Sequence, residues 1–122
     1  RAEIARADGP LFLFVVTIEN HGPWGPGRLP GVDDPEKQYA MHLVNSDRMM
    51  GGVAEALKER PGGGLLCLYG DHAPARTLHP SLPDRRAADY LLWDSRRFAA
   101  PSPRLDLDVD AIGRMLIDQA NS

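Results

Sequence analysis

The sequence contains one cysteine, Cys67, and no apolar run longer than the eight residues from Leu11 to Ile18. One cysteine excludes an intramolecular disulfide and a zinc site built from cysteines. The apolar run is far shorter than the ~20 residues that a membrane-spanning helix needs. Charge of one sign is also scarce, because 14 basic and 17 acidic residues leave a net charge of −3. We therefore expect no nucleic-acid partner.

Glycine and proline, by contrast, are abundant. The 122 residues include 12 glycines and 11 prolines. Together they make up about a fifth of the chain, against a usual share of roughly 12%. Eleven of these 23 residues lie in two stretches, residues 19–34 and 70–86, and each stretch follows a short apolar segment. This distribution predicts two long ordered loops, and loops of this length are often functional.

Three short apolar segments are typical of β-strands. The run from Leu11 to Ile18 is rich in β-branched and aromatic residues, which predicts a strand buried on both faces. Residues 65–69 and 90–93 form two shorter segments of the same kind. Because a helical pattern separates the first two segments, the sequence predicts an α/β fold, a mainly parallel sheet flanked by helices.

Two segments have helical patterns. The longer one starts with Asp34 as a capping residue and Pro35 at the first helical position. Its pattern predicts a helix of about six turns that ends before Pro61. The second helix is expected to start at Asp108 or Asp110. In the first helix, the face expected to pack on the core consists of Tyr39, Leu43, Ser46, Met50, Val53 and Leu57.

Two polar clusters follow the first two predicted strands. The first is the TIENHGPW segment at residues 17–24, and the second is YGDHAP at residues 69–74. In open α/β sheets, ligands bind beyond the carboxyl ends of the strands. If the two strands are parallel, both clusters lie at the same edge of the sheet.

Each cluster residue has a functional and a structural interpretation. Asp71 and His72 combine a hard oxygen with an imidazole, which suits zinc or manganese. As an isolated dipeptide they are more typical of a turn-capping aspartate and a surface histidine. His21 is either a third ligand or hydrogen-bond donor to an anionic substrate, or a loop histidine packed on Trp24. Glu19 is either a ligand or base, or a solvated loop acid.

Other polar residues are weaker candidates. His42 lies within the predicted helix, beside its apolar stripe, and we expect it to be structural. His79 is a weak site candidate in the loop before Pro80. Cys67 lies in the middle of a predicted strand, where a thiol is expected to be inert.

The two clusters and the helix between them resemble the sulfatase family of the alkaline phosphatase superfamily. Within that family, the sequence is most similar to lipoteichoic acid synthase-like enzymes, which are phosphoglycerol transferases. Phosphoethanolamine transferases have a similar histidine-glycine-proline loop. The resemblance covers roughly residues 10–120. It rests on three blocks in order: FLFVVTIENHGPW at 12–24, then Tyr39, Ser46-Asp47 and Leu57, then LYGDHAP at 68–74.

The resemblance implies a role for individual residues. Asp71 and His72 match the metal-binding aspartate and histidine of the family, and His21 matches the histidine that contacts the phosphate or sulfate group. Asn20 and Trp24 would belong to the substrate pocket. The implied cofactor is a divalent metal, either zinc or manganese, or calcium or magnesium in a sulfatase. The implied substrate is an anionic phospho- or sulfo-ester, such as a lipid headgroup or an envelope glycan.

The implied reaction is phosphoglycerol or other phosphoryl-group transfer, or phosphodiester hydrolysis, in cell-envelope synthesis on the periplasmic or extracytoplasmic face of the membrane. A sulfatase and a non-catalytic α/β binding module are the alternatives. The nucleophile and remaining metal ligands of the family precede the matched blocks. We therefore expect residues 1–122 to be the C-terminal portion of the catalytic domain and inactive alone. Their partner would be the upstream half of that domain, with membrane-anchoring segments further upstream.

Overall fold

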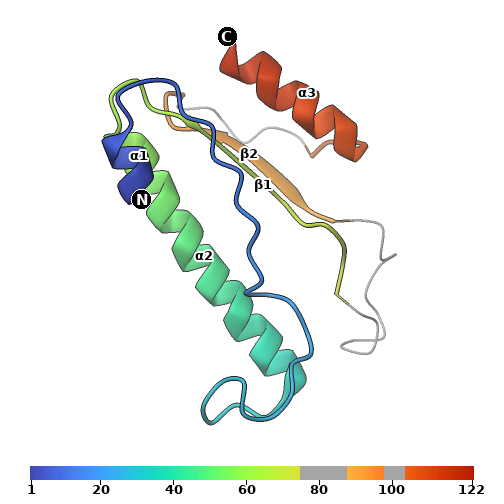
Figure 1. Ribbon diagram of the computed structural model, residues 1–122. Coiled ribbons are helices and arrows are strands. Elements are labelled where there is room, and N and C mark those ends of the chain that lie inside the picture. Colours follow the sequence, from blue (N-terminus) through green and yellow to red (C-terminus); the bar gives the residue numbers. More distant parts are fainter. Residues whose placement is uncertain (75–87, 98–103) are drawn as a thin grey trace.

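The computed structural model describes residues 1–74, 88–97 and 104–122 (Figure 1). Their elements follow the order α1 (Ala2–Arg6), α2 (Pro35–Glu59), β1 (Leu65–Tyr69), β2 (Tyr90–Asp94) and α3 (Val109–Ala120). The mixture of helices and strands agrees with the predicted α/β class. In this part of the chain, no helix combines the length and the apolar character needed to cross a membrane.

Helix α2 is the longest element and has the predicted bounds. The Asp34 side chain caps it by accepting a hydrogen bond from the Lys37 backbone N–H at 2.8 Å. Pro35 occupies the first turn, where its missing N–H costs no helical hydrogen bond. The helix ends at Glu59, two residues before Pro61. The start of α3 after Asp108 is also confirmed, whereas α1 was not predicted.

Strands β1 and β2 form an antiparallel pair. Leu65 lies opposite Asp94 at one end of the pair, and Tyr69 lies opposite Tyr90 at the other. Both strands were predicted from their apolar residues. The parallel pairing that we expected is not found among the residues that the structure describes, whose named strands form this two-stranded sheet.

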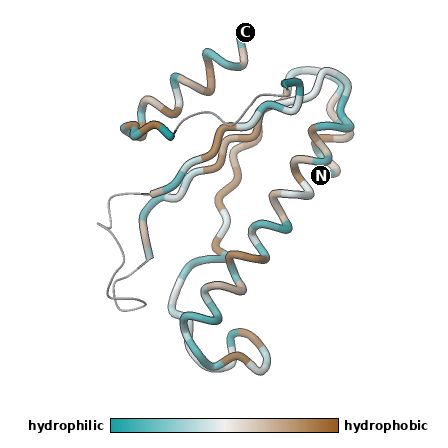
Figure 2. Tube along the Cα trace, turned by 180° about the vertical axis from the view of Figure 1, so that it is seen from behind, coloured by the Kyte–Doolittle hydropathy of each residue, from teal (hydrophilic) through white to brown (hydrophobic). Residues whose placement is uncertain are grey.

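Residues 11–18 differ most from their prediction. They belong to no strand, and Phe12, Val16 and Ile18 are 77%, 74% and 78% exposed. In Figures 1 and 2 this apolar segment runs between α2 and the β1–β2 pair, in the same direction as β1. The prediction of a strand buried on both faces is wrong for this structure. A strand of that kind needs backbone partners on both sides, and the described residues supply none in a sheet.

The hydrophobic core is small and lies near the C-terminal end of α2. Ala56 and Leu57 are buried against Ile4 of α1. Gly64 packs closely here, because a Cβ at that position would lie 2.6 Å from Leu57 Cδ2 and would force this side chain to shift. The partly buried residues that complete this cluster are Val53, Leu66 and Trp93.

In the N-terminal half of α2, the buried residues are polar. Gln38 is completely buried and His42 is 4% exposed, whereas Leu43 is 43% exposed. The predicted apolar face is therefore wrong in this half of the helix, where the buried face is displaced by one residue from Tyr39 and Leu43. The reason is that α2 packs here on a polar loop, residues 19–32, whose backbone groups need hydrogen-bonding partners.

Candidate functional site

The first polar cluster is a turn directly after the apolar segment 11–18. The His21 backbone N–H donates to the Ile18 carbonyl oxygen at 3.1 Å, which closes this turn. Trp24 packs edge-to-face on Tyr39 of α2, with ring centroids 5.2 Å apart. His21 itself is exposed. It is therefore not buried against Trp24, as the structural alternative for this residue would require.

One nitrogen of the His21 ring already has a hydrogen-bonding partner. Its Nδ1 lies 2.6 Å from the Gly22 carbonyl oxygen. Because a carbonyl oxygen only accepts, Nδ1 carries the proton and donates it. The remaining nitrogen, Nε2, donates to an anion only when the ring carries both protons. His21 can therefore bind an anionic oxygen as an imidazolium.

Glu19 is neither a plain solvated acid nor a member of an acidic cluster. Its Oε1 accepts hydrogen bonds from His42 Nδ1 at 2.9 Å and from Asn45 Nδ2 at 2.8 Å. These contacts, the one with His42 first, hold the pKa of the Glu19 carboxyl below its ordinary value. The next residue, Asn20, accepts through Oδ1 from Ser46 Oγ at 3.1 Å.

The loop backbone is held by two further side chains. Arg28 donates to the carbonyl oxygens of Glu19 at 2.9 Å and Pro23 at 3.1 Å, and also to that of His21. Gln38 Nε2 donates at 2.7 Å to each of the carbonyl oxygens of Gly25 and Val32. A cleft of about 330 Å³ opens beside this network, lined by Glu19, Asn45, Ser46 and Met49.

The second cluster, Asp71 and His72, directly follows β1. Both side chains are exposed, and His72 Nε2 lies 3.5 Å from Asp71 Oδ2. His72 Nδ1 donates to the Ala73 carbonyl oxygen at 2.8 Å. This contact leaves Nε2 with the lone pair that a divalent metal requires. The two residues therefore fit the metal role as a pair of ligands, one oxygen and one nitrogen.

The two clusters lie at the same end of the molecule. Segment 11–18 and β1 run in the same direction in both views (Figures 1 and 2), and each cluster begins where its segment ends. No hydrogen bond joins the two clusters in the part of the chain that the structure describes, and no group of three or more potential metal ligands occurs there. The weak candidate His79 lies outside the described residues.

Comparison with known proteins gives the family of the chain. The family model described as Sulfatase matches residues 1–112. The chain belongs to the sulfatase family. Its fold is accordingly the α/β fold of alkaline phosphatase-like enzymes, as the resemblance of the sequence indicated.

One curated relative of this sulfatase-family chain is the capsular polysaccharide biosynthesis protein RkpI of Rhizobium meliloti (strain 1021). The two are 34% identical over 111 residues, which cover 86% of the chain and 20% of RkpI. The chain thus spans about a fifth of the length of this relative. No solved structure matches the chain.

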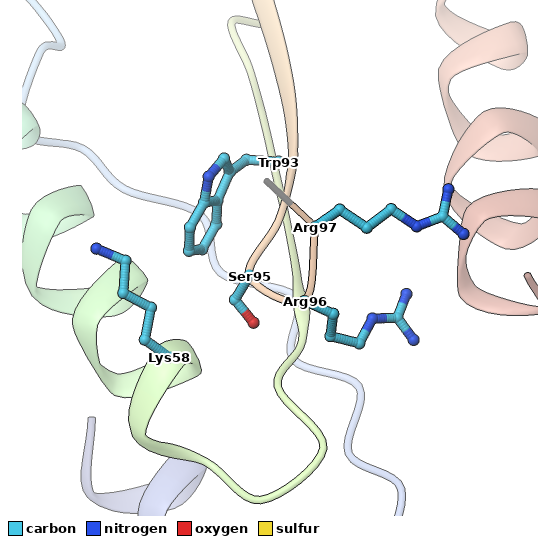
Figure 3. Close-up of a pocket in the computed structure, with 5 residues that line it drawn as sticks. All are labelled: Lys58, Trp93, Ser95, Arg96 and Arg97. Atoms are coloured by element: carbon cyan, nitrogen blue, oxygen red, sulfur yellow. The ribbon is translucent and has the colours of Figure 1, made fainter. Parts of the chain in front are cut away.

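A second hollow of this sulfatase-family chain lies at the end of the strand pair that is far from Asp71 and His72. It has a volume of about 470 Å³, and Figure 3 shows Lys58, Trp93, Ser95, Arg96 and Arg97 around it. Its cations have carboxylate partners: Arg96 Nε lies 2.8 Å from Asp94 Oδ1, and Lys58 Nζ lies 2.7 Å from Glu55 Oε1. Arg96 holds the pKa of Asp94 far below its ordinary value. The charged groups around this hollow therefore stabilise the end of the strand pair, and we do not include them in the candidate site.

Sequence reasoning missed the residues that hold the first cluster in place. Gln38, Asn45 and Arg28 had no assigned role, and His42 was expected to be structural without a named partner. One signal was present in the sequence. Polar residues at positions 38, 42, 45 and 46 recur at helical spacing, so they share one face of α2. That face lies beside the apolar residues, such as Leu43, that were predicted to pack on the core.

Proposed function

We propose that this sulfatase-family chain supplies substrate-binding and metal-binding residues to an enzyme that transfers or hydrolyses a phosphoryl ester in cell-envelope synthesis. One observation carries the proposal: two polar clusters, His21 with its neighbours and Asp71 with His72, follow extended apolar segments that run in the same direction. The printed name of the relative RkpI, a capsular polysaccharide biosynthesis protein, favours an envelope polysaccharide or its lipid carrier as the acceptor.

Asp71 and His72 would hold a divalent metal, zinc or manganese. Such a metal, when bound, supplies Lewis-acid stabilisation of the negative charge on the transferring group. The contribution of this chain is orientation, because the Ala73 carbonyl oxygen fixes the His72 ring with Nε2 as the ligand atom. Catalytic zinc sites usually take three protein ligands, so residues 1–122 alone are expected to bind zinc weakly.

The first cluster would bind the ester oxygens. His21 Nε2 donates to an anionic oxygen when the imidazole is doubly protonated, because Nδ1 is committed to Gly22. The Asn20 amide can add a second donor, since Ser46 already occupies its carbonyl oxygen. Trp24, fixed against Tyr39, would form a wall of the substrate pocket. Together these groups would neutralise and orient the substrate before the transfer step.

The test is an assay of the complete gene product that contains this chain. We expect cleavage of bis(p-nitrophenyl) phosphate that requires zinc or manganese and is lost on chelation. His21→Ala should lower kcat/KM by about 100-fold, the scale on which single charge-stabilising donors act. His72→Ala, which removes a metal ligand, should lower it at least as much. Lys37→Ala, which changes an exposed side chain outside both clusters, serves as the control.

The alternatives give different outcomes in the same assay. Preferential cleavage of p-nitrophenyl sulfate, supported by calcium or magnesium, would replace the phosphoryl proposal with sulfate ester hydrolysis. The absence of metal-dependent turnover of either ester would favour a non-catalytic α/β binding module. Residues 1–122 expressed alone should turn over neither substrate.

The proposed place of action is the periplasmic or extracytoplasmic face of the cell membrane, where an envelope acceptor is assembled. Protease treatment of intact spheroplasts tests this proposal. Digestion of the segment around Asp71 before the cells are lysed is the expected result, and complete protection until lysis would contradict it.

A further inference from the structure

The N-terminal half of α2 presents a polar stripe to the first cluster. Its members, Gln38, His42, Asn45 and Ser46, all donate hydrogen bonds to residues 19–32. Their spacing of four, three and one residues keeps them on one face of the helix. Gln38 and His42 are nearly or completely buried, although burial of polar groups is unfavourable unless they make hydrogen bonds. Their contacts therefore have a directional role that apolar side chains cannot fill.

Two members of this stripe, His42 and Asn45, converge on Glu19. A single oxygen, Oε1, accepts from both His42 Nδ1 at 2.9 Å and Asn45 Nδ2 at 2.8 Å. Hydrogen bonds to an ionised acceptor are shorter and stronger than neutral ones. The Glu19 backbone is fixed as well, because Arg28 donates to its carbonyl oxygen at 2.9 Å. Glu19 is thus held at both its side chain and its backbone.

The consequence extends along the chain to His21. Asn20 follows Glu19 and is held by Ser46, and Arg28 contacts the carbonyl oxygens of His21 and Pro23. Residues 19–23 are therefore held by α2 through the side chains of Glu19 and Asn20, and by Arg28 through three backbone carbonyl oxygens. Within this segment, His21 and Pro23 are exposed, and His21 is the one that carries a titratable ring.

We infer that Glu19 and His42 are positioning residues, which set the backbone of residues 19–23 so that His21 and Asn20 face an anionic ester. This inference rests on the proposed function of His21. Neither Glu19 nor His42 touches the substrate in this arrangement. The effect of His42 passes through the Glu19 carboxylate, and that of Glu19 passes through the backbone to the next two residues.

Four variants of the complete gene product test the role of His42. His42→Leu fills much of the ring volume but removes the Nδ1 donor, whereas His42→Asn places an amide N–H near the position of Nδ1. Glu19→Gln keeps an acceptor oxygen without the charge. Leu43→Ala changes the adjacent, exposed position of the same helix and serves as the matched control.

His42→Leu should lower kcat/KM for bis(p-nitrophenyl) phosphate by about 10- to 100-fold, the range expected for one lost hydrogen bond to a charged group. Most of the loss should be a higher KM, because His21 and Asn20 bind the substrate anion. His42→Asn should stay within about threefold of wild type if it restores the donor. Glu19→Gln should be intermediate, and Leu43→Ala should be unchanged.

Two readouts report the loop conformation without turnover. They are amide hydrogen exchange of residues 18–24 and the rate at which diethyl pyrocarbonate acylates His21. Both should increase in His42→Leu, with the exchange of residues 53–59 unchanged. Equal losses of activity in His42→Leu and His42→Asn would overturn the inference, as would unchanged exchange at residues 18–24 in His42→Leu. If the wild type turns over no ester, the proposed function fails, and the two conformational readouts alone decide the positioning role.

Discussion

The two halves of α2 have different roles. Near its C-terminal end, Ala56 and Leu57 pack on Ile4, and these contacts form the apolar core. In its N-terminal half, Gln38 and His42 are equally buried but bind a loop through hydrogen bonds. Apolar burial is non-directional and mainly stabilises, whereas hydrogen bonds are directional and fix positions. One end of α2 therefore holds the fold together, and the other end places the candidate site.

The largest effect on stability is expected from the apolar end. Leu57→Ala removes a core side chain that is 8% exposed, and such changes cost about 2–5 kcal/mol. Urea unfolding of the complete gene product should show this loss in its free energy of unfolding. In the fraction that stays folded, the acylation rate of His21 should match the wild type. A faster rate would mean that the two halves of α2 are coupled.

A smaller loss is expected from the polar end. Gln38→Leu keeps a similar volume but leaves the carbonyl oxygens of Gly25 and Val32 without their donor, at a cost of about 1–3 kcal/mol. Hydrogen exchange should increase first in residues 25–32. Gln38→Glu, which keeps the shape and also lacks the amide donor, is the matched comparison. If Gln38→Leu raises the free energy of unfolding, apolar packing contributes more than directional hydrogen bonds in the N-terminal half of α2.

Acid should weaken the polar end before the apolar end. The pKa of Glu19 is held below its ordinary value of 4.5 by His42 and Asn45. Ionised Glu19 therefore stabilises the folded state above that value, and this contribution disappears as the pH falls through the lowered pKa. Relative to the intrinsic rate at each pH, hydrogen exchange at residues 18–24 should increase at acidic pH, while Leu57 stays buried. In Glu19→Gln this increase should be absent, and its persistence would assign the acid sensitivity to another group.

The smallest effect on stability is expected at the second cluster. Asp71 and His72 have side chains that are 86% and 63% exposed, so Asp71→Asn and His72→Ala should change stability by no more than about 0.5 kcal/mol. Zinc binding by the complete gene product, measured by calorimetry, should weaken in both variants. A large drop in thermal stability without metal would contradict the assignment of these residues to a functional rather than a structural role.

The sequence predicted the bounds of the helices and strands better than it predicted which of these elements pair or pack together. Asp34, Pro35 and Pro61 are local signals, and they placed both ends of α2. The apolar runs placed β1 and β2 in the same way. The run from 11 to 18 has an equally strong pattern but lies exposed, because a strand also depends on neighbouring strands that no local pattern encodes.

The candidate site was predicted in part for the same reason. His21, Asp71 and His72 could be selected because motif and order along the chain are properties of the sequence. For Glu19, the sequence alone allows either a ligand or base, or a solvated loop acid. Its partners, His42 and Asn45, follow it by 23 and 26 residues, and a contact at that separation depends on how the loop folds back on α2.

By itself, the sequence selected the candidate site residues, and it determined the ends of the long helix and membership of the sulfatase family. Capping, helical periodicity and motif spacing are short-range properties, so each is visible in the order of residues. Only the tertiary structure decided which face of α2 is buried. Leu43 and His42 are adjacent, and hydrophobicity alone favours Leu43, yet the loop that covers this half of the helix has backbone and carboxylate groups that need donors. The side chain that could donate was buried, and the apolar neighbour was left exposed.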